Sequence, residues 1–411
     1  MRILTTALAL LLLAACQAQT PNVPTAQPVV KSTPASRQSR IVCGAERTKE
    51  VVALLQGKKV ALLVNQTAMV GKTHLVDTLL GLDVDVVKIF APEHGFRGGA
   101  DAGEHVNDSI DKRTGIRIAS MYGDKKKPSA KDLEGIDVVV FDIQDVGLRF
   151  FTYISSLHYL MEACAENNKE VLVLDRPNPN GWYVDGPVMQ PAFKSFVGMD
   201  AVPVVHGLTV AEYAQMLNGE KWLANGVQCK LKTVTCLNYD HTKRYSLPIK
   251  PSPNLPNDYA IQLYPAICLL EGANISVGRG TDKPFQMIGG PKVANAPDTF
   301  TPKSLPGAKT PPFLNEQCFG FDLTKADNQI KGDVADTAFT FKYVMLMYTL
   351  STDKANFFLK NNFFDKLVGN DNVRKMIIAE RKYDEIQASY AAELEAYKKK
   401  RKLYLLYPDF Y

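Results

Sequence analysis

The segment Ala91–Gly99 carries three side chains that can do acid–base or anion-binding chemistry. It reads Ala-Pro-Glu-His-Gly-Phe-Arg-Gly-Gly and follows the apolar run 84–90, which predicts a buried strand. The glycines allow the backbone to turn sharply and to approach a ligand closely. We therefore expect Glu93 to be a catalytic group, and His94 and Arg97 to contact the substrate.

Polar residues also follow two later predicted strands, 137–141 and 171–174. The first strand is followed by Asp142, Gln144, Asp145 and Arg149, and the second by Asp175 and Arg176. Because ligands of open parallel sheets bind beyond the carboxyl ends of the strands, we expect the first group to share a site with Glu93. Asp142 and Asp145 can instead cap the following turn and helix. For Asp175 and Arg176 we favour an ion pair that braces a loop.

Further polar residues come from later parts of the chain. A helix predicted over 258–270 is preceded by a proline-rich loop with Asn254, and is followed by Glu271, Asn274 and Arg279. A helix-ending turn at Gly272 does not explain why Arg279 lies between two glycines. His206 precedes a capping box and can serve either the site or the helix start. We expect Glu271 to be a catalytic candidate and the other four residues to bind substrate.

The order of the predicted elements favours an α/β fold. Helices are expected over 48–56, 73–80 and 153–167, and strands over 59–64, 84–90, 137–141 and 171–174. Apolar strands separated by amphipathic helices are typical of a Rossmann-like parallel sheet covered on both faces. A length of 411 residues leaves room for a second, smaller domain. We place the first domain at 41–250 and a smaller α+β domain, which contributes to the cleft, at 251–411.

Motifs for common cofactors and metals are absent from the sequence. It has no Gly-x-Gly-x-x-Gly spacing after a strand, no Walker-type loop, and no Cys-x-x-Cys or His-Glu-x-x-His spacing. We therefore expect no cofactor and no metal. The net charge of +5 is small and the basic residues are dispersed, so a nucleic-acid partner is not expected.

The first 40 residues predict an export signal and a tether. Residues 1–16 combine a positive start, a short apolar core and a Leu-Ala-Ala-Cys sequence that resembles a bacterial lipobox, so we expect lipidation at Cys16. The Pro-, Gln-, Ser- and Thr-rich segment 17–40 predicts a flexible tether. We expect a lipoprotein of the cell envelope, periplasmic or outer-membrane associated, held to the membrane only by its lipid. An ordinary cleaved signal peptide is the alternative, and no specific disulfide is predicted.

Five motifs resemble one known family when they are read in order. They begin at Ala91 (Ala-Pro-Glu-His-Gly-Phe-Arg-Gly), Phe141 (Phe-Asp-Ile-Gln-Asp-Val-Gly), Asp175 (Asp-Arg-Pro-Asn-Pro), Pro251 (Pro-Ser-Pro-Asn) and Glu271 (Glu-Gly-x-Asn-x-Ser-x-Gly-Arg-Gly-Thr). Together they resemble the NamZ-type exo-β-N-acetylmuramidases. The resemblance implies release of terminal N-acetylmuramic acid from the non-reducing end of peptidoglycan-derived glycan fragments, in cell-wall turnover or scavenging. It also implies a Rossmann-like domain with a smaller C-terminal domain, and a role in catalysis for Glu93.

Cleavage of a glycosidic bond normally needs an acid and a second group that attacks the sugar or activates water. Glu93 can be the acid, and Asp142, Asp145 and Glu271 are the candidates for the second group. A separation of about 5–5.5 Å between the two carboxyl groups predicts retention and about 6.5–9.5 Å predicts inversion. A route assisted by the 2-acetamido group of the substrate is also open. The lactyl carboxylate of muramic acid suits an arginine fork from Arg97, Arg149 or Arg279.

Two other functions fit the same residues. A non-catalytic envelope lipoprotein that binds muropeptides or glycan fragments would use the polar residues as sugar contacts. A metal-dependent hydrolase would use Glu93, His94, Asp142 and Asp145, although this spacing is no recognisable signature of a hard-metal site. Release of free sugar and insensitivity to chelators separate these functions from glycosidase activity.

Overall fold

The computed structural model describes residues 40–93, 95–96, 108–325 and 339–411. The expected lipidation site Cys16 and the expected substrate contacts His94 and Arg97 lie outside the described residues. The described chain from Arg40 to Tyr411 forms one compact unit.

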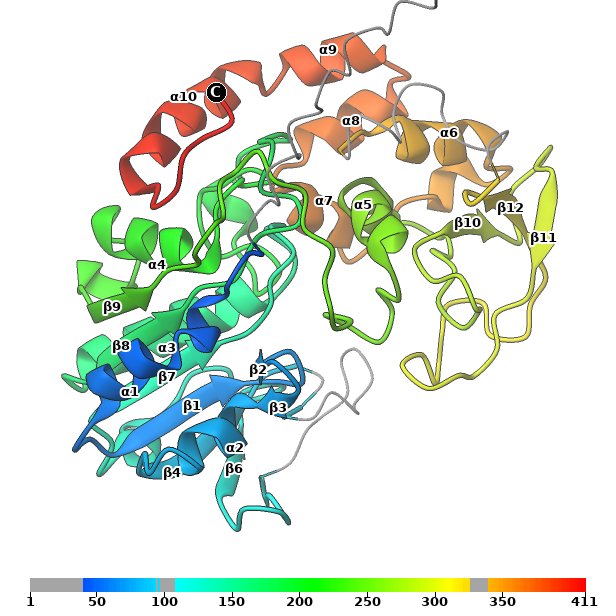
Figure 1. The fold of residues 1–411 in the computed structure, drawn as a ribbon. Helices are drawn as coiled ribbons and strands as arrows, with labels where there is room; N and C mark the ends of the chain where they lie inside the picture. Colours follow the sequence, from blue (N-terminus) through cyan, green and yellow to red (C-terminus); the bar gives the residue numbers. More distant parts are fainter. Residues whose placement is uncertain (1–39, 94, 97–107, 326–338) are drawn as a thin grey trace, which may run out of the picture. The chain divides into compact units, whose positions relative to one another are not determined.

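A seven-stranded sheet forms the centre of the first domain (Figure 1), in the order β5-β6-β4-β1-β7-β8-β9. The strands are β1 (Val60–Val64), β4 (Val86–Ala91), β5 (Ser109–Ile110), β6 (Arg117–Ser120), β7 (Val138–Asp142), β8 (Glu170–Leu174) and β9 (Lys230–Val234). Neighbouring strands run parallel, except that β5 is antiparallel to β6. The parallel α/β arrangement expected from the sequence is therefore confirmed.

Helices cover both faces of this sheet. They are α1 (Thr48–Leu55), α2 (Leu75–Leu80), α3 (Tyr153–Glu166) and α4 (Val210–Gly219). Successive residues of β1 point to opposite faces, so Leu62 packs in one hydrophobic cluster with α1 and α2, and Leu63 packs in another with α3 and α4. Burial on both faces explains why all five residues of β1 are apolar. The carboxyl ends of the parallel strands meet at one edge, and Glu93 follows β4 there.

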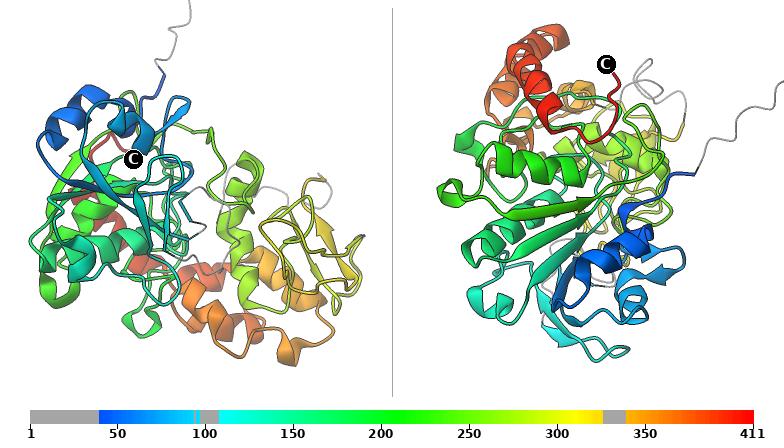
Figure 2. Two further views of the ribbon diagram at one scale, coloured as in Figure 1. Left: turned by 90° about the horizontal axis from the view of Figure 1, so that it is seen from below. Right: turned by 60° about the vertical axis from the view of Figure 1, so that its left-hand side comes forward.

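The second domain combines helices with a small antiparallel sheet (Figure 2). Its elements are α5 (Asp258–Ile267), β10 (Met287–Gly290), β11 (Asp298–Phe300), β12 (Cys318–Asp322), α6 (Lys342–Leu350), α7 (Phe363–Val368) and α8 (Asn372–Ile378). A 3-10 turn extends α5 to Gly272, where an added Cβ would lie 2.4 Å from the Cα of Phe364. Glycine at this position lets α7 pack directly against the loop that carries Glu271.

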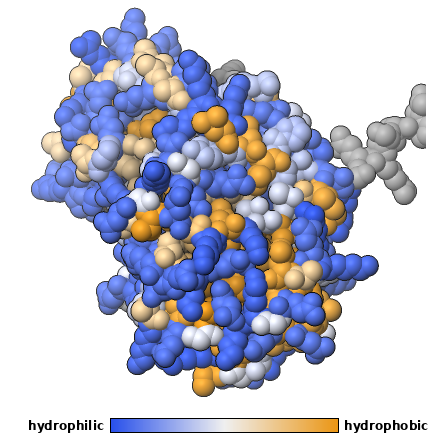
Figure 3. All heavy atoms as spheres, turned by 90° about the vertical axis from the view of Figure 1, so that its left-hand side faces the viewer, coloured by the Kyte–Doolittle hydropathy of each residue, from blue (hydrophilic) through white to orange (hydrophobic). Residues whose placement is uncertain are grey.

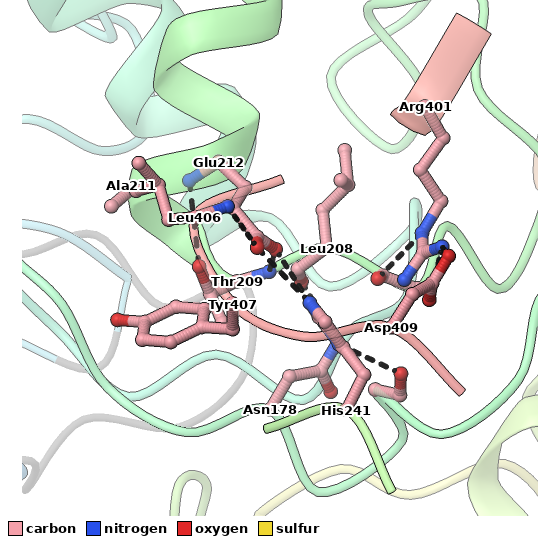
Figure 4. Close-up of polar contacts among 12 residues, drawn as sticks. Asn178, Leu208, Thr209, Ala211, Glu212, His241, Arg401, Leu406, Tyr407 and Asp409 are labelled. Carbon is pink, nitrogen blue, oxygen red and sulfur yellow. Dashed lines mark hydrogen bonds and ion pairs between the residues drawn. The ribbon is translucent and has the colours of Figure 1, made fainter. Parts of the chain in front are cut away.

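The C-terminal segment returns to the first domain after α9 (Tyr383–Ala388) and α10 (Ala391–Arg401). The Tyr407 hydroxyl donates a hydrogen bond of 2.5 Å to Oδ2 of Asp175, and the Leu406 amide donates one of 2.8 Å to Oε1 of Glu212. Glu212 also binds the buried side chain of His241, as Figure 4 shows. Residues 402–411 therefore stabilise the first domain, although they follow helices of the second.

Hydrophobic residues occur in separate groups among hydrophilic ones on the face shown in Figure 3. Of the helices in the described part of the chain, none combines the length and the apolar character needed to cross a membrane.

Two helical patterns of the sequence are interrupted in the structure. Thr73 and His74 pair with Met69 and Val70 as a short hairpin, β2 (Met69–Val70) and β3 (Thr73–His74), and the His74 side chain caps α2. The helix expected from residue 73 therefore begins at Leu75. The second pattern, an amphipathic sequence over 372–402 that is rich in Lys and Glu, is divided into α8, α9 and α10.

Candidate active site

A cavity of about 210 Å³ lies beside Glu93, where side chains from the two domains meet. Residues 41–250 contribute Glu93, Tyr122, Phe150, Phe151, Thr152, Tyr153, Phe196 and Val197 to its lining. Residues 251–411 contribute Ser252, Tyr264, Cys268, Glu271, Arg279, Phe363 and Leu367. The cavity follows the ends of β4 and β6, which is the edge of a parallel sheet where ligands are expected.

The carboxylate of Glu93 is held by two hydroxyl groups. Tyr122 donates a hydrogen bond of 2.9 Å to Oε1, and Thr152 donates one of 2.7 Å to Oε2. Burial and the negative charge of Glu93 raise the pKa of Tyr122, so its hydroxyl keeps the proton that it donates. These contacts fix the orientation of the Glu93 carboxylate within the cavity.

A second carboxylate, Glu271, lines the same cavity and is paired with an arginine. Nε of Arg279 donates a hydrogen bond of 2.6 Å to Oε1 of Glu271, and the Cys268 thiol lies 3.5 Å from Oε2. Although burial opposes the charged form, attraction to Glu271 raises the pKa of Arg279. The Arg279 guanidinium also lies 4.9 Å from the centre of the Phe285 ring. Arg279 therefore stays charged, with 17% of its side chain accessible.

Aromatic rings form much of the cavity wall. The ring centres of Phe150 and Tyr264 are 5.5 Å apart, and those of Phe151 and Tyr153 are 5.0 Å apart, each pair meeting edge to face. At the Phe196 side, Nζ of Lys126 lies 4.9 Å from the ring centre. The cavity thus combines two carboxylates and one arginine with apolar surfaces.

Asp142 lies away from this cavity in a buried ion pair. Its Oδ1 and Oδ2 accept hydrogen bonds of 2.5 and 2.9 Å from Nε and Nη2 of Arg176, and both side chains are at most 5% exposed. Asp175 instead binds Tyr407 and the backbone amide of Ala211, so the ion pair that we favoured between Asp175 and Arg176 does not form. The partner of Arg176 is the carboxylate at the end of the neighbouring strand.

Asp145 and His206 are buried beside each other. His206 Nε2 lies 3.9 Å from Oδ2 of Asp145, and that oxygen also accepts a 2.5 Å hydrogen bond from the Gly147 amide. Burial raises the pKa of Asp145 to about 7. Burial, reinforced by nearby arginine charges, lowers the pKa of His206 to about 3. Neither residue is part of the cavity lining, and the geometry favours the turn-capping alternative for Asp145.

Arg149 is fully buried and binds backbone carbonyl groups. Nη1 donates hydrogen bonds of 2.9 and 2.7 Å to the carbonyls of Pro187 and Val202, and Nη2 donates one of 2.8 Å to the carbonyl of Leu367. Burial lowers the pKa of Arg149 to about 9. This arginine joins the two domains and has no surface for a substrate carboxylate.

Three amide side chains expected at the site are also engaged elsewhere. Gln144 donates hydrogen bonds of 2.8 Å to the carbonyls of Asp145 and Pro177, and Asn254 donates one of 2.8 Å to the carbonyl of Gly307. Asn274 lines a separate hollow of about 180 Å³. Of the described candidates, the structure therefore brings together Glu93, Glu271 and Arg279.

The two residues that hold the Glu93 carboxylate, Tyr122 and Thr152, were not among those expected from the sequence. Tyr122 follows the short strand β6 just as Glu93 follows β4, and Thr152 comes directly before α3. Their positions after a strand and at a helix start are the signals that could have identified them. The four-residue strand 117–120 was too short to be predicted.

In the described residues, His, Cys, Asp and Glu side chains form no group of three or more that could hold a metal ion. The cavity holds two carboxylates, which are the groups that cleavage of a glycosidic bond normally needs, on a parallel α/β fold.

Comparison with known proteins assigns the family. The model described as "Exo-beta-N-acetylmuramidase NamZ, N-terminal" matches residues 60–259, and the corresponding C-terminal model matches residues 262–407. Peptidoglycan beta-N-acetylmuramidase NamZ of Bacillus subtilis is 38% identical over 372 residues, which are 86% of this chain and 88% of that protein. The chain therefore belongs to the NamZ family of exo-β-N-acetylmuramidases.

Two crystal structures of DUF1343 family proteins from Bacteroides fragilis share the fold. One has a TM-score of 0.83 and 46% identity, covering 90% of this chain and all of that chain. The other has a TM-score of 0.75 and 30% identity, covering 90% of this chain and 99% of that chain. Both matches include the first and the second domain.

Proposed function

We propose that this protein removes terminal N-acetylmuramic acid from the non-reducing end of peptidoglycan fragments. The observation that carries the proposal is the position of Glu93, whose carboxylate is held by Tyr122 and Thr152 inside the cavity. Family membership and the similarity to the Bacillus subtilis enzyme support the same reaction.

Glu93 acts in this proposal as the acid that protonates the leaving oxygen. Glu271 is the second carboxylate in the cavity, where it is paired with Arg279, and a carboxylate at this place can stabilise a developing oxocarbenium ion. Asp142 and Asp145 are engaged outside the cavity and take no part. In a route assisted by the 2-acetamido group, Glu271 would orient that group instead of attacking the sugar.

Arg279 is the proposed contact for the lactyl carboxylate that distinguishes muramic acid from glucosamine. Its Nε is bound to Glu271, whereas its two Nη groups have no hydrogen bond to another described residue. A guanidinium binds a carboxylate best through two parallel N–H groups. Phe285 and Glu271 fix its plane, so the fork is already oriented for this contact.

The variant Glu93→Gln tests the proposed acid. It keeps the size and polarity of the side chain but removes the acidic proton, so kcat on a disaccharide of N-acetylmuramic acid and N-acetylglucosamine, whose sugar leaving group needs that proton, should fall about 100-fold or more. Glu220→Gln is a matched control, because Glu220 binds Lys400 and Tyr404 and does not line the cavity. Near wild-type turnover by Glu93→Gln, or no release of free sugar by the unchanged protein, would contradict the proposal.

The proposed cellular location of the protein rests on the sequence alone. The lipobox-like sequence before Cys16 and the tether over 17–40 support a lipoprotein at the cell envelope, where the enzyme would serve cell-wall turnover. A fatty-acid label incorporated by the exported protein and lost in Cys16→Ala would support the lipid anchor. Equal labelling of the two proteins would contradict it.

A further inference from the structure

The beginning of the folded unit is paired with the chain that leaves β9. Val42 and Leu237 form an antiparallel bridge through two backbone hydrogen bonds, of 3.1 Å from the Val42 amide and 2.8 Å from the Leu237 amide. Because these two residues exchange both bonds, the next residues on each segment, Cys43 and Cys236, face each other at a non-hydrogen-bonded position. The register thus places two cysteines in direct opposition.

Side chains come closest at such a position. Cβ atoms opposite each other across an antiparallel pair are about 4.5–5.5 Å apart, at the short end for non-hydrogen-bonded pairs, and a disulfide needs about 3.5–4.5 Å. The Cys43 and Cys236 side chains are both 5% exposed, so they point into the molecule. Little movement of the backbone is needed to join them.

The two thiols interact with each other. Hydrogen bonding to the Cys236 thiol lowers the pKa of Cys43, and the charge of Arg176 acts in the same direction. The same contact raises the pKa of Cys236. Burial instead raises the pKa of Cys164 and Cys318, which keeps those thiols protonated. The opposite shifts of the two pKa values come from one contact between the two sulfur groups, as the register of the backbone pair predicts.

Three distant parts of the chain meet around this pair. The Gly44 amide binds the carbonyl of Asp175 at 2.8 Å, and the Cys236 amide binds the hydroxyl of Tyr407 at 2.8 Å. Cys236 and Tyr407 form a small hydrophobic cluster with Tyr239, and Ile41 packs against it. A covalent bond here would fasten the N-terminal segment to the sheet beside the C-terminal segment.

We propose that Cys43 and Cys236 form a disulfide when the protein folds in an oxidising compartment. The bond closes the N-terminal segment onto the exit of β9, directly after the tether that the sequence predicts. Any pull on the tether is then carried by the sheet rather than by the two hydrogen bonds of Val42. This inference is independent of the reaction proposed for Glu93.

The chemistry is an exchange with a disulfide donor, either a protein dithiol oxidase or a small disulfide. The Cys43 thiolate attacks one donor sulfur and releases the other as a thiolate, which takes up a proton. The Cys236 thiolate then attacks the Cys43 sulfur of this mixed disulfide and releases the second donor thiol. The two cysteines lose two electrons and two protons, and the donor disulfide gains them. Because both side chains are buried, the exchange must precede docking of the N-terminal segment.

Thiol counting and peptide mapping test the bond. The full chain is produced with its export signal in a bacterial periplasm, and a second sample is reduced, unfolded and refolded with glutathione disulfide. Each sample is alkylated in denaturant with and without prior reduction. We expect two fewer free thiols before reduction, and a cross-linked peptide pair containing Cys43 and Cys236. The oxidised protein should have a Tm about 5 °C or more above that of the reduced protein.

Variants give the control. Cys43→Ser and Cys236→Ser should each abolish the cross-link and the Tm difference, whereas Cys229→Ser, at the other end of β9, should keep both. A Cys43–Cys236 cross-link in the refolded sample supports the proposal even if the exported sample lacks it. Absence of the linkage from both wild-type samples, or a linkage between another pair of cysteines, would overturn the proposal without any variant having to fold.

Discussion

The hydroxyl of Tyr122 donates a hydrogen bond of 2.9 Å to Oε1 of Glu93, and this contact joins the ends of two adjacent parallel strands, β6 and β4. Tyr122 is a positioning residue, because it acts on the substrate through Glu93. A hydrogen bond to a carboxylate contributes about 1.5–3 kcal/mol, so Tyr122→Phe should lower kcat by about 10- to 100-fold. KM should change little, and the pH profile of kcat should shift, because the substitution removes a hydrogen bond that is donated to the carboxylate.

The matched control for this prediction is Tyr404→Phe. That substitution also removes a tyrosine hydroxyl that donates to a glutamate, since Tyr404 binds Oε1 of Glu220 at 2.8 Å, but the pair does not line the cavity. Its kcat and pH profile should match the wild type. An unshifted profile in Tyr122→Phe, with only a loss of stability, would mean that Tyr122 has no positioning role.

Arg279→Lys tests the selectivity for muramic acid. Lysine keeps the charge beside Glu271 but loses the planar fork, so KM for muramic substrates should rise about 10-fold or more. A glycoside of N-acetylglucosamine lacks the lactyl group and should be little affected. Arg374→Lys is the control, because Arg374 pairs with Asp365 outside the cavity. An equal rise in KM for the two substrates would show that Arg279 only holds Glu271 in place.

The edge of the sheet where the site lies could be predicted from the sequence, but the partners of its side chains could not. Glu93 follows a run of apolar residues long enough to identify a strand, and its position after that strand was sufficient to propose the site. Glu271 and Arg279 follow a recognisable helix. Pairing depends instead on which strands are neighbours. Asp142 ends β7 and Arg176 follows the adjacent strand β8, so they bind each other rather than the substrate.

Burial was the other quantity that the sequence did not reveal. Arg149 and Asp145 occur where polar residues are mixed with apolar ones after a strand, and both lie in the interior. Arg149 is covered where the Leu367 carbonyl of α7 approaches it from the second domain, whereas Asp145 is buried beside His206 of the first domain. The short strand before Tyr122 gave no usable periodicity. Long-range packing, rather than local pattern, therefore decided which polar residues reach the cavity.

Asp142→Asn should reduce stability much more than activity. The substitution leaves the Arg176 guanidinium buried without its counter-charge, which costs about 3–5 kcal/mol. Urea unfolding should show the loss, while kcat of the folded fraction stays near the wild-type value. The double variant Asp142→Leu with Arg176→Met removes both charges and should recover much of the stability. A large fall in kcat, with no change in the free energy of unfolding, would show that Asp142 acts in the active site.

Asp145 gives the folded protein a specific dependence of stability on pH. Burial raises its pKa to about 7, well above the value near 3.9 expected in the unfolded chain, so the folded state holds one more proton between these values. The stabilising contribution of the protonated carboxyl is complete below about pH 4 and is lost as the pH rises through about 7. His206 changes the stability in the opposite direction as the pH rises, because burial lowers its pKa to about 3. This contribution is present with or without Asp145.

The variant Asp145→Asn isolates that contribution. An amide of the same shape can still accept the hydrogen bond from the Gly147 amide, and it does not ionise. Unfolding free energies of the two proteins should therefore diverge with pH, the wild type losing a few kcal/mol relative to the variant between about pH 4 and pH 7. Denaturant titrations at intervals of pH measure the difference directly. A constant difference across this range would show that Asp145 stays ionised in the fold, and that its buried charge has a partner other than the Gly147 amide.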